Sequence, residues 1–275
     1  MYPSALRQYT GANVGVTRFF LRKWYLDIVT DGGDAAIIYA AQLTIGAVRV
    51  GYQSLLRHSP GLPTTTRTRF RAPTEPHQHD DTLHWHSRAL DTRGTWAATA
   101  PPVERTVLDD AHGCIRWNCL APGARATLVD GATTLTGHGY AEVLTLTAPP
   151  WSLPIRELWW GRFVSADACL TWIDWRGPHT FRTVLLDGVE VADATVNEGG
   201  IASPTVNLRF DLTELLRQGQ LGFSALSLLP RRVLQILPGR TLLIDETKWL
   251  SRSRLQRAGK AESHGWTIHE VVRWP

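Results

Sequence analysis

The segment from Lys23 to Thr44, KWYLDIVTDGGDAAIIYAAQLT, decides the fold class of this chain. It contains two runs rich in β-branched, aromatic and aliphatic residues, and the turn sequence Asp-Gly-Gly-Asp separates them. Such runs are typical of strands, and glycine allows the tight turn between them. A third run, AVRVGYQSLL at 47–56, follows Gly46 and is expected to pair with the second. We therefore predict antiparallel strands from this region onward.

The rest of the chain repeats this organisation. Short strand-like runs follow one another with turn residues between them, which is typical of a sandwich or a barrel. The Asp187-Gly188 pair between two alternating runs predicts a hairpin, because both turn positions require a positive φ. The expected exception is one short helix over DLTELLRQG at 211–219, with Asp211 as its N-cap and Gly219 at its end.

A proline-rich segment divides the chain. TAPPWSLPI at 147–155 contains three prolines, which cannot lie in a central strand. We place a domain boundary there and predict two tandem β-domains, residues 1–150 and 151–275. The fold class is therefore all-β, with two barrel or sandwich units and one short helix.

The composition excludes several functional classes. The net charge is +4, from 29 basic and 25 acidic residues, and no dense basic run suggests a nucleic-acid partner. Three cysteines make a disulfide framework improbable in so long a chain and favour a reducing compartment. The start of the sequence has no signal pattern and no basic amphipathic helix that would form a stable membrane anchor, so we expect a cytoplasmic protein. No phosphate-cradling glycine loop is present, and we expect no cofactor.

One strand carries an acid on an apolar face. In GHGYAEVLTL at 137–146, alternation places Tyr140, Glu142, Leu144 and Leu146 on the same face. Burial among such residues raises the pKa of a carboxyl, and a protonated carboxyl is a proton donor. Aromatic faces around it would stabilise a developing cation. The alternative is an ordinary ion pair between Glu142 and Arg156 or Arg162.

Other segments offer further candidates. In KWYLD, Trp24 lies on one face and Tyr25 and Asp27 on the other, which makes Asp27 a second candidate acid or a turn-stabilising residue. The histidine-rich stretch HQHDDTLHWH at 77–86 contains two His-x-His pairs that could ligate a metal. Because no second group of ligands with suitable spacing occurs elsewhere, we expect no metal and interpret this stretch as a polar edge strand.

Three of these segments together resemble a known family. KWYLDIVTDGGDAAIIYAA, CIRWNCLAPGA and GHGYAE are similar to segments of the carotenoid 1,2-hydratases, or hydroxyneurosporene synthases, and more distantly of tocopherol cyclases and other lipocalin-like cyclases. The similarity covers mainly residues 20–163. It implies two lipocalin-like (calycin) β-barrels or half-barrels in tandem, in agreement with the two β-units predicted above.

The resemblance also implies roles for individual residues. Tyr140 and Glu142 match the family's Tyr-x-Asp, and Trp117 matches its strand tryptophan, positions associated with protonating an isoprenoid double bond and guiding water to the cation. The chain departs from the family where its acid is a glutamate, where Ile115 and Arg116 occupy the region of a family histidine, and where VLTLTAPPW follows the acid. These departures favour related chemistry, such as cyclisation or isomerisation, over carotenoid hydration itself.

The predicted function is that of an enzyme that protonates a carbon–carbon double bond of a hydrophobic, isoprenoid or polyene-type substrate in an aromatic pocket between the two β-units. The predicted catalytic residues are Glu142, Tyr140 and Asp27. The predicted substrate-binding residues are Trp117, Trp24, Tyr25, Trp160 and Trp172. The alternative is a lipocalin-like carrier of a hydrophobic molecule with no chemistry of its own. The sequence does not determine the oligomeric state.

Overall fold

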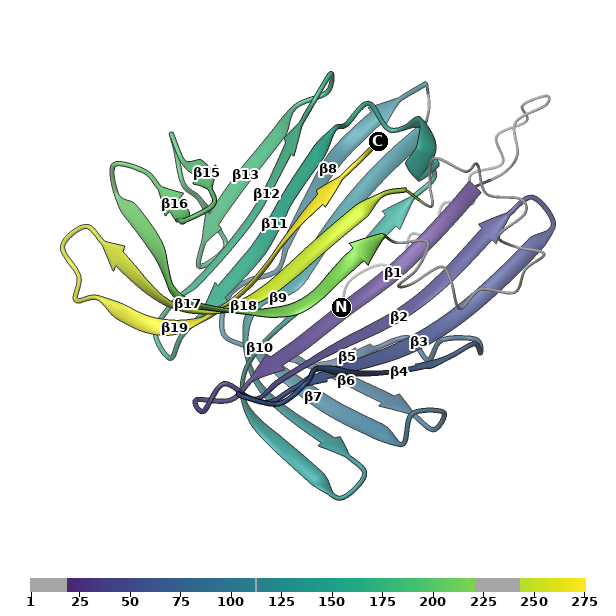
Figure 1. Ribbon diagram of the computed structural model, residues 1–275, viewed down its shortest axis with the longest axis horizontal. Coiled ribbons are helices and arrows are strands. Elements are labelled where there is room, and N and C mark those ends of the chain that lie inside the picture. The colour runs from purple at the N-terminus through teal and green to yellow at the C-terminus, as the bar shows by residue number, and fades with distance from the viewer. Residues whose placement is uncertain (1–18, 112, 221–242) are drawn as a thin grey trace.

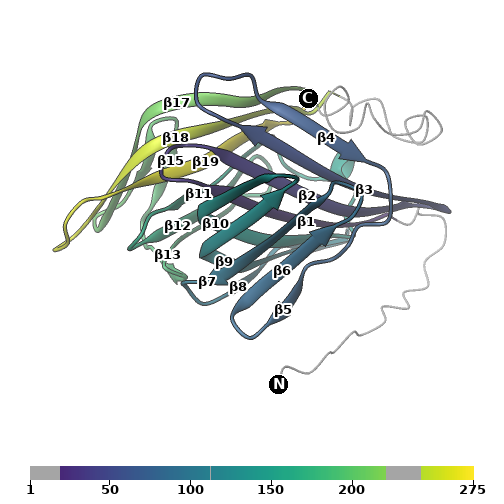
Figure 2. The ribbon, with the colours of Figure 1, turned by 90° about the horizontal axis from the view of Figure 1, so that it is seen from below.

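The chain folds almost entirely into antiparallel β-structure (Figure 1). The computed structural model describes residues 19–111, 113–220 and 243–275. Two sheets account for the described strands, and one face of the second sheet lies against one face of the first (Figures 1 and 2). The predicted all-β class with two lipocalin-like units is confirmed.

The first sheet has ten strands, ordered β4-β3-β2-β1-β10-β9-β7-β6-β5, with β8 also paired to β9. Its strands are β1 (Phe19–Val29), β2 (Ala35–Ile45), β3 (Val48–His58), β4 (Thr65–Arg69), β5 (His77–His79), β6 (Thr82–Ser87), β7 (Thr92–Ala98), β8 (Val103–Asp110), β9 (Gly113–Asp130) and β10 (Thr133–Leu146). The predicted strand–turn–strand segment forms β1 and β2, which pair with each other and are interior strands of this sheet.

The second sheet has nine strands, ordered β14-β13-β12-β11-β19-β18-β17-β16-β15. Its strands are β11 (Glu157–Val164), β12 (Cys169–Arg176), β13 (Phe181–Leu186), β14 (Val189–Glu190), β15 (Thr195–Asn197), β16 (Gly200–Ala202), β17 (Val206–Gln220), β18 (Asp245–Arg257) and β19 (Ser263–Arg273). A single 3₁₀ turn, η1 (Pro150–Ser152), lies in the proline-rich segment between the sheets. The domain boundary that we placed at this segment stays a prediction.

The turn predictions are confirmed by backbone angles. Asp187 and Gly188 have φ values of 51° and 83°, so both central residues of the β13–β14 hairpin are left-handed, as the Asp-Gly signal requires. Gly46, between β2 and β3, has a φ of 59°. Glycine adopts such angles without the steric cost that a Cβ would add.

The predicted helix over 211–219 is wrong, because this segment lies in β17 and pairs with β18. Two β-bulges, between Phe210 and Leu212 and between Leu215 and Arg217, interrupt the alternation of the strand. As a result, Leu212 and Leu215 are 66% and 50% exposed, whereas Leu216 is buried. Two exposed leucines three residues apart resemble the period of a helix. The expected N-cap Asp211 instead pairs with Arg254 of β18.

Three buried clusters show which faces meet. One is a buried cluster on the face of the first sheet opposite to Tyr25 and contains Trp24, Leu26 and Ile28. Another is a buried cluster on the face of the second sheet opposite to Trp160 and contains Phe163 and Trp172. The largest lies between the sheets and takes residues from both. The interface between the sheets is therefore the central core of the protein.

The cysteines and the apolar segments were the remaining features considered from the sequence. All three cysteines, Cys114, Cys119 and Cys169, are unpaired. In the part of the chain that the structure describes, no helix is long and apolar enough to cross a membrane.

Candidate active site between the two sheets

Glu142 lies in the central core, and three donors converge on one of its oxygens. Its Oε2 accepts hydrogen bonds from Trp117 Nε1 at 2.5 Å, Tyr140 Oη at 2.6 Å and Trp160 Nε1 at 3.2 Å. Trp117 and Tyr140 belong to the first sheet, whereas Trp160 belongs to the second. Glu142 as a residue is only 6% exposed. Glu142 therefore links the two sheets at a position that solvent hardly reaches.

Local backbone features place this carboxyl. The pairing of β9 with β10 shifts register twice, between Gly139 and Ala141 and between Ala141 and Glu142. Such bulges change the direction of the side chains beside them. Gly139 lets β1 approach closely, because a Cβ there would lie 2.5 Å from the carbonyl oxygen of Asp27. The Gly-x-Gly-Tyr-x-Glu stretch thus combines close backbone packing with a bulge at the acid.

The hydrogen bonds indicate which oxygen carries a proton. An indole N–H donates only, so Oε2 must act as an acceptor toward both tryptophans. Burial raises the pKa of the Glu142 carboxyl, and the hydrogen bonds from Tyr140 and Trp117 oppose this shift without cancelling it. Because Oε2 is occupied as an acceptor, a proton on Glu142 resides on Oε1. A protonated Glu142 would therefore be held in one orientation, with its O–H on Oε1.

The second predicted acid, Asp27, has a different environment. Arg162 of β11 donates to its two oxygens, from Nε at 2.9 Å and from Nη2 at 2.7 Å, and neither side chain is exposed to solvent. Arg162 also donates to the carbonyl oxygen of Trp266 at 2.9 Å. Burial raises the pKa of Asp27, while the charge and hydrogen bonds of Arg162 act in the opposite direction. This bidentate pair occupies both carboxylate oxygens, so Asp27 has a bridging position rather than that of an available donor.

The strand registers arrange the site as two facing rows. Across the first sheet, Tyr39, Tyr25 and Glu142 are successive cross-strand neighbours on β2, β1 and β10. Across the second sheet, the corresponding row consists of Arg217, Lys248, Glu270 and Trp160 on β17, β18, β19 and β11.

Each residue of the first row contacts at least one residue of the second row. The Arg217 guanidinium lies 5.4 Å from the ring centroid of Tyr39, and the Lys248 ammonium lies 5.4 Å from that of Tyr25. At the end of the rows, Trp160 donates to Glu142. The site is therefore a strip of aromatic and charged side chains enclosed between the sheets.

The charged groups of the second row form a compact network. Lys248 is 1% exposed and forms an ion pair with Glu270, and Arg217 donates to both oxygens of Glu246. Burial acts to lower the pKa of Lys248, but Glu270, Tyr39 and Glu246 together outweigh burial and raise this pKa overall, so the ammonium stays charged. Burial likewise acts to raise the pKa of Glu246, but the positive charges of Arg217, Lys248 and Lys23 and the hydrogen bonds from Arg217 together lower it to about 2. The ammonium of the half-buried Lys23, 5.6 Å from the ring centroid of Tyr39, is a third positive group beside this network.

The structure brings together most of the predicted site residues. Glu142, Tyr140, Trp117 and Trp160 share the hydrogen-bonded cluster, and the Tyr25 ring lies 5.0 Å from the Trp160 ring and 6.0 Å from the Tyr140 ring. The catalytic and binding roles of these residues remain predictions. The ion pair of Glu142 with Arg156 or Arg162, considered from the sequence, does not occur, because Arg162 binds Asp27.

Two predicted binding residues lie elsewhere. Trp24 is buried in the cluster on the opposite face of the first sheet, and Trp172 is buried in the cluster on the opposite face of the second sheet. Neither is part of the central cluster. The histidine-rich stretch forms the hairpin of β5 and β6, where the rings of the paired residues His77 and His84 stack at 5.4 Å. Among the described residues, no group of three or more potential ligands is arranged to hold a metal ion.

Sequence reasoning missed the charged row of the second sheet. Lys248 and Glu246 share a face of β18 with Leu250, and Glu270 shares a face of β19 with Ile268. A charged residue on the apolar face of a strand is the same signal that identified Glu142. Applied to these two strands, it would have indicated Lys248 and Glu270.

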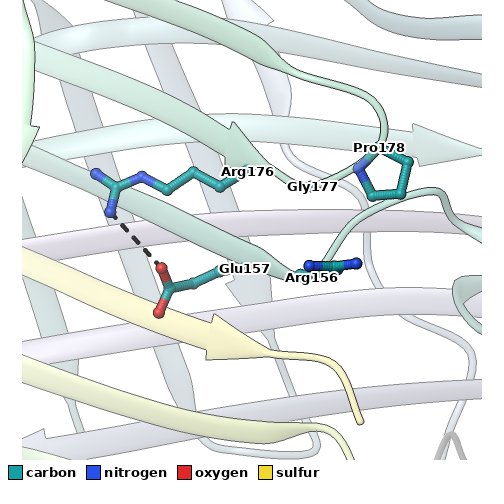
Figure 3. Close-up of a pocket in the computed structure, with 5 residues that line it drawn as sticks. All are labelled: Arg156, Glu157, Arg176, Gly177 and Pro178. Carbon is teal, nitrogen blue, oxygen red and sulfur yellow. Dashed lines mark ion pairs between the residues drawn. The ribbon is translucent and has the colours of Figure 1, made fainter.

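A separate hollow lies on the surface of the second sheet (Figure 3). It is lined by Arg156, Glu157, Arg176, Gly177 and Pro178, and Arg176 forms an ion pair with Glu157 at 3.6 Å. Its lining is open and charged, and none of these residues belongs to the Glu142 cluster. It is therefore distinct from the candidate active site.

Comparison with solved structures gives this architecture a context. CghA in its complex with Sch210972 superposes with a TM-score of 0.53 at 11% identity, over 93% of this chain and 89% of that one. Kievitone hydratase from Nectria haematococca superposes with a TM-score of 0.51 at 10% identity, over 94% and 89% of the respective chains. This chain shares their fold. No protein-family profile matches the sequence. No curated protein matches it either.

Proposed function

We propose that this protein is an enzyme that protonates a carbon–carbon double bond of a hydrophobic substrate, with Glu142 as the proton donor. The observation that carries the proposal is the set of three donors on Glu142 Oε2. They hold a buried carboxyl with a raised pKa in one orientation and leave Oε1 to present its proton. The substrate would lie between the two sheets, against Tyr25, Tyr140 and Trp160.

The proposed reaction begins with transfer of the Oε1 proton to one carbon of the double bond. The π-electron pair forms the new C–H bond, and the neighbouring carbon becomes a cation. Electron-rich ring faces beside it would stabilise this charge. The cation then gains water, is attacked by a second double bond, or loses a different proton. Each route ends when a proton returns to the Glu142 carboxylate, so the acid is regenerated and only hydration consumes water.

The comparisons support this proposal at the level of the fold. One structural neighbour is named a hydratase, and the name concerns that protein's own substrate. The resemblance of Tyr140 and Glu142 to the Tyr-x-Asp of the carotenoid hydratases points to the same step. The tests below therefore include more than one class of olefin and do not assume an isoprenoid.

The decisive experiment is product analysis with purified wild type and Glu142→Gln. Linear polyenes and olefinic ketones are incubated with each protein, and products are followed by mass spectrometry for gain of one water or for isomers of unchanged mass. We expect Glu142→Gln to lose at least a hundredfold in turnover, because general acid catalysis typically contributes that much. Glu104→Gln, which changes an exposed glutamate on β8, is the matched control and should retain full activity.

Two outcomes would contradict the proposal. Equal turnover by wild type and Glu142→Gln would remove Glu142 as the acid. Binding of hydrophobic ligands without conversion of any of them would favour the carrier alternative, in which the enclosed aromatic strip serves only for binding.

A further inference from the structure

The ammonium group of Lys248 has donor capacity that the protein does not use. It carries three N–H donors, and among the described residues only Glu270 lies within hydrogen-bond distance. Glu246 lies farther away, at 3.8 Å, and the remaining neighbours are the ring faces of Tyr25 and Trp160 at 5.4 and 5.2 Å. A charged group that is 1% exposed and incompletely hydrogen-bonded is costly to maintain in a core.

The hydroxyl of Tyr39 is a second unused donor in the same place. It is buried and has no hydrogen-bond partner among the described residues. Its ring lies beside the Arg217 guanidinium, and Lys248 is the charged group with the largest effect on the hydroxyl. Tyrosine hydroxyls in protein cores are normally hydrogen-bonded, and leaving one unpaired costs stability. Lys248 and Tyr39 are thus two buried donors without sufficient acceptors in one strip of side chains, because Lys248 lies over the Tyr25 ring and that ring is 5.5 Å from the Tyr39 ring.

We propose that Lys248 and Tyr39 bind a carbonyl oxygen of the substrate, so that the olefin protonated by Glu142 belongs to a hydrophobic ketone or related carbonyl compound and not to a plain hydrocarbon. This inference rests on the proposed function for the identity of the reacting group. A carbonyl oxygen has two lone pairs and accepts two hydrogen bonds, one from each donor. A hydrocarbon in the same place would leave both donors unpaired.

The position of this donor pair fits a substrate of moderate size. Tyr25 lies one strand from Glu142 and Tyr39 lies two strands away. Because neighbouring strands are about 4.8 Å apart, the carbonyl oxygen and the protonated carbon would be separated by about 5–10 Å. A conjugated or polycyclic ketone spans this distance.

Binding measurements with two matched probes test the inference. Chalcone, an olefinic ketone, and 1,3-diphenylpropene share one carbon skeleton and differ in the carbonyl group. Dissociation constants are measured by equilibrium dialysis with chromatographic quantification, which needs no turnover. We expect Tyr39→Phe to weaken chalcone binding about fivefold to tenfold, the effect of one lost hydrogen bond, and to leave 1,3-diphenylpropene binding within about twofold.

Two further variants sharpen the test. Thr267→Val removes another buried hydroxyl without a partner, on the opposite face of β19 from Glu270, and should change neither affinity. The double variant Lys248→Met, Glu270→Leu removes one positive and one negative charge together and should also weaken only the ketone. Circular dichroism confirms that each variant is folded before its affinity is compared.

The outcomes separate this inference from the proposed function. Failure of chalcone to bind the wild type, or an equal effect of Tyr39→Phe on both probes, would overturn the carbonyl site whatever Glu142 does. Selective loss of ketone binding in Tyr39→Phe, together with unchanged turnover in Glu142→Gln, would support the carbonyl site and remove the acid. The two proposals can therefore fail independently.

Discussion

Replacing Glu142 by glutamine also tests whether this side chain is a neutral acid in the folded protein. The amide oxygen of glutamine can take the place of Oε2 and accept the same three hydrogen bonds from Trp117, Tyr140 and Trp160. At acidic pH, where glutamate is protonated in both the folded and unfolded states, the two proteins should therefore differ in free energy of unfolding by no more than about 1 kcal/mol.

The difference should grow with pH in a defined window. The pKa of Glu142 is raised in the folded protein above its ordinary value of 4.5. Above about pH 4.5 the unfolded chain releases this proton while the folded protein keeps it, so the folded state binds more protons. The wild type should then lose about 1.4 kcal/mol of stability per pH unit relative to Glu142→Gln, and the loss should end at the folded-state pKa.

The assay is urea unfolding followed by tryptophan fluorescence at intervals between about pH 4 and pH 8, where the linear extrapolation gives the free energy of unfolding. All other titrating groups are shared by the two proteins, so their contributions cancel in the difference. A difference that is constant across this range would refute the raised pKa. A wild type that gains stability relative to the variant would show that the three donors hold Glu142 as a carboxylate, unsuited to donate a proton.

Three further changes have outcomes that follow from the contacts of the site. Arg162→Met should cost about 3–5 kcal/mol in urea unfolding because it leaves the buried Asp27 carboxylate unpaired, whereas the double variant Arg162→Met, Asp27→Leu should recover most of that loss. Trp117→Phe removes a donor that favours the charged form of Glu142, so the pH window described above should extend to higher pH, and an unchanged window would show that the indole has no effect on the acid. Gly139→Ala introduces a Cβ at 2.5 Å from the Asp27 carbonyl oxygen and should lower stability by about 1–3 kcal/mol in thermal or urea unfolding, while wild-type stability would show that the backbone of β1 can move away.

Local features of this protein could be predicted from the sequence because they depend on neighbours along the chain. Alternation on β10 placed Tyr140 and Glu142 on one apolar face, and the structure has both in the central core. The Asp187-Gly188 turn was predicted from its backbone requirement, and its φ values agree. The predicted helix over 211–219 failed for a reason that is not local, since the bulges of β17 exist only in its pairing with β18.

The sequence by itself determined that this is an antiparallel β-protein with an acid on the apolar face of a strand, because strand alternation and turn geometry act over a few residues. Only the tertiary structure decided which faces meet. Alternation separates Trp24 from Tyr25, but only sheet packing places Tyr25 toward Lys248 and Trp24 away from it. The partner of Asp27 lies 135 residues away in the chain, and no local pattern specifies such a pair. The chemistry of the site depends on two rows of side chains that come from different sheets, and their register is set by packing between the sheets.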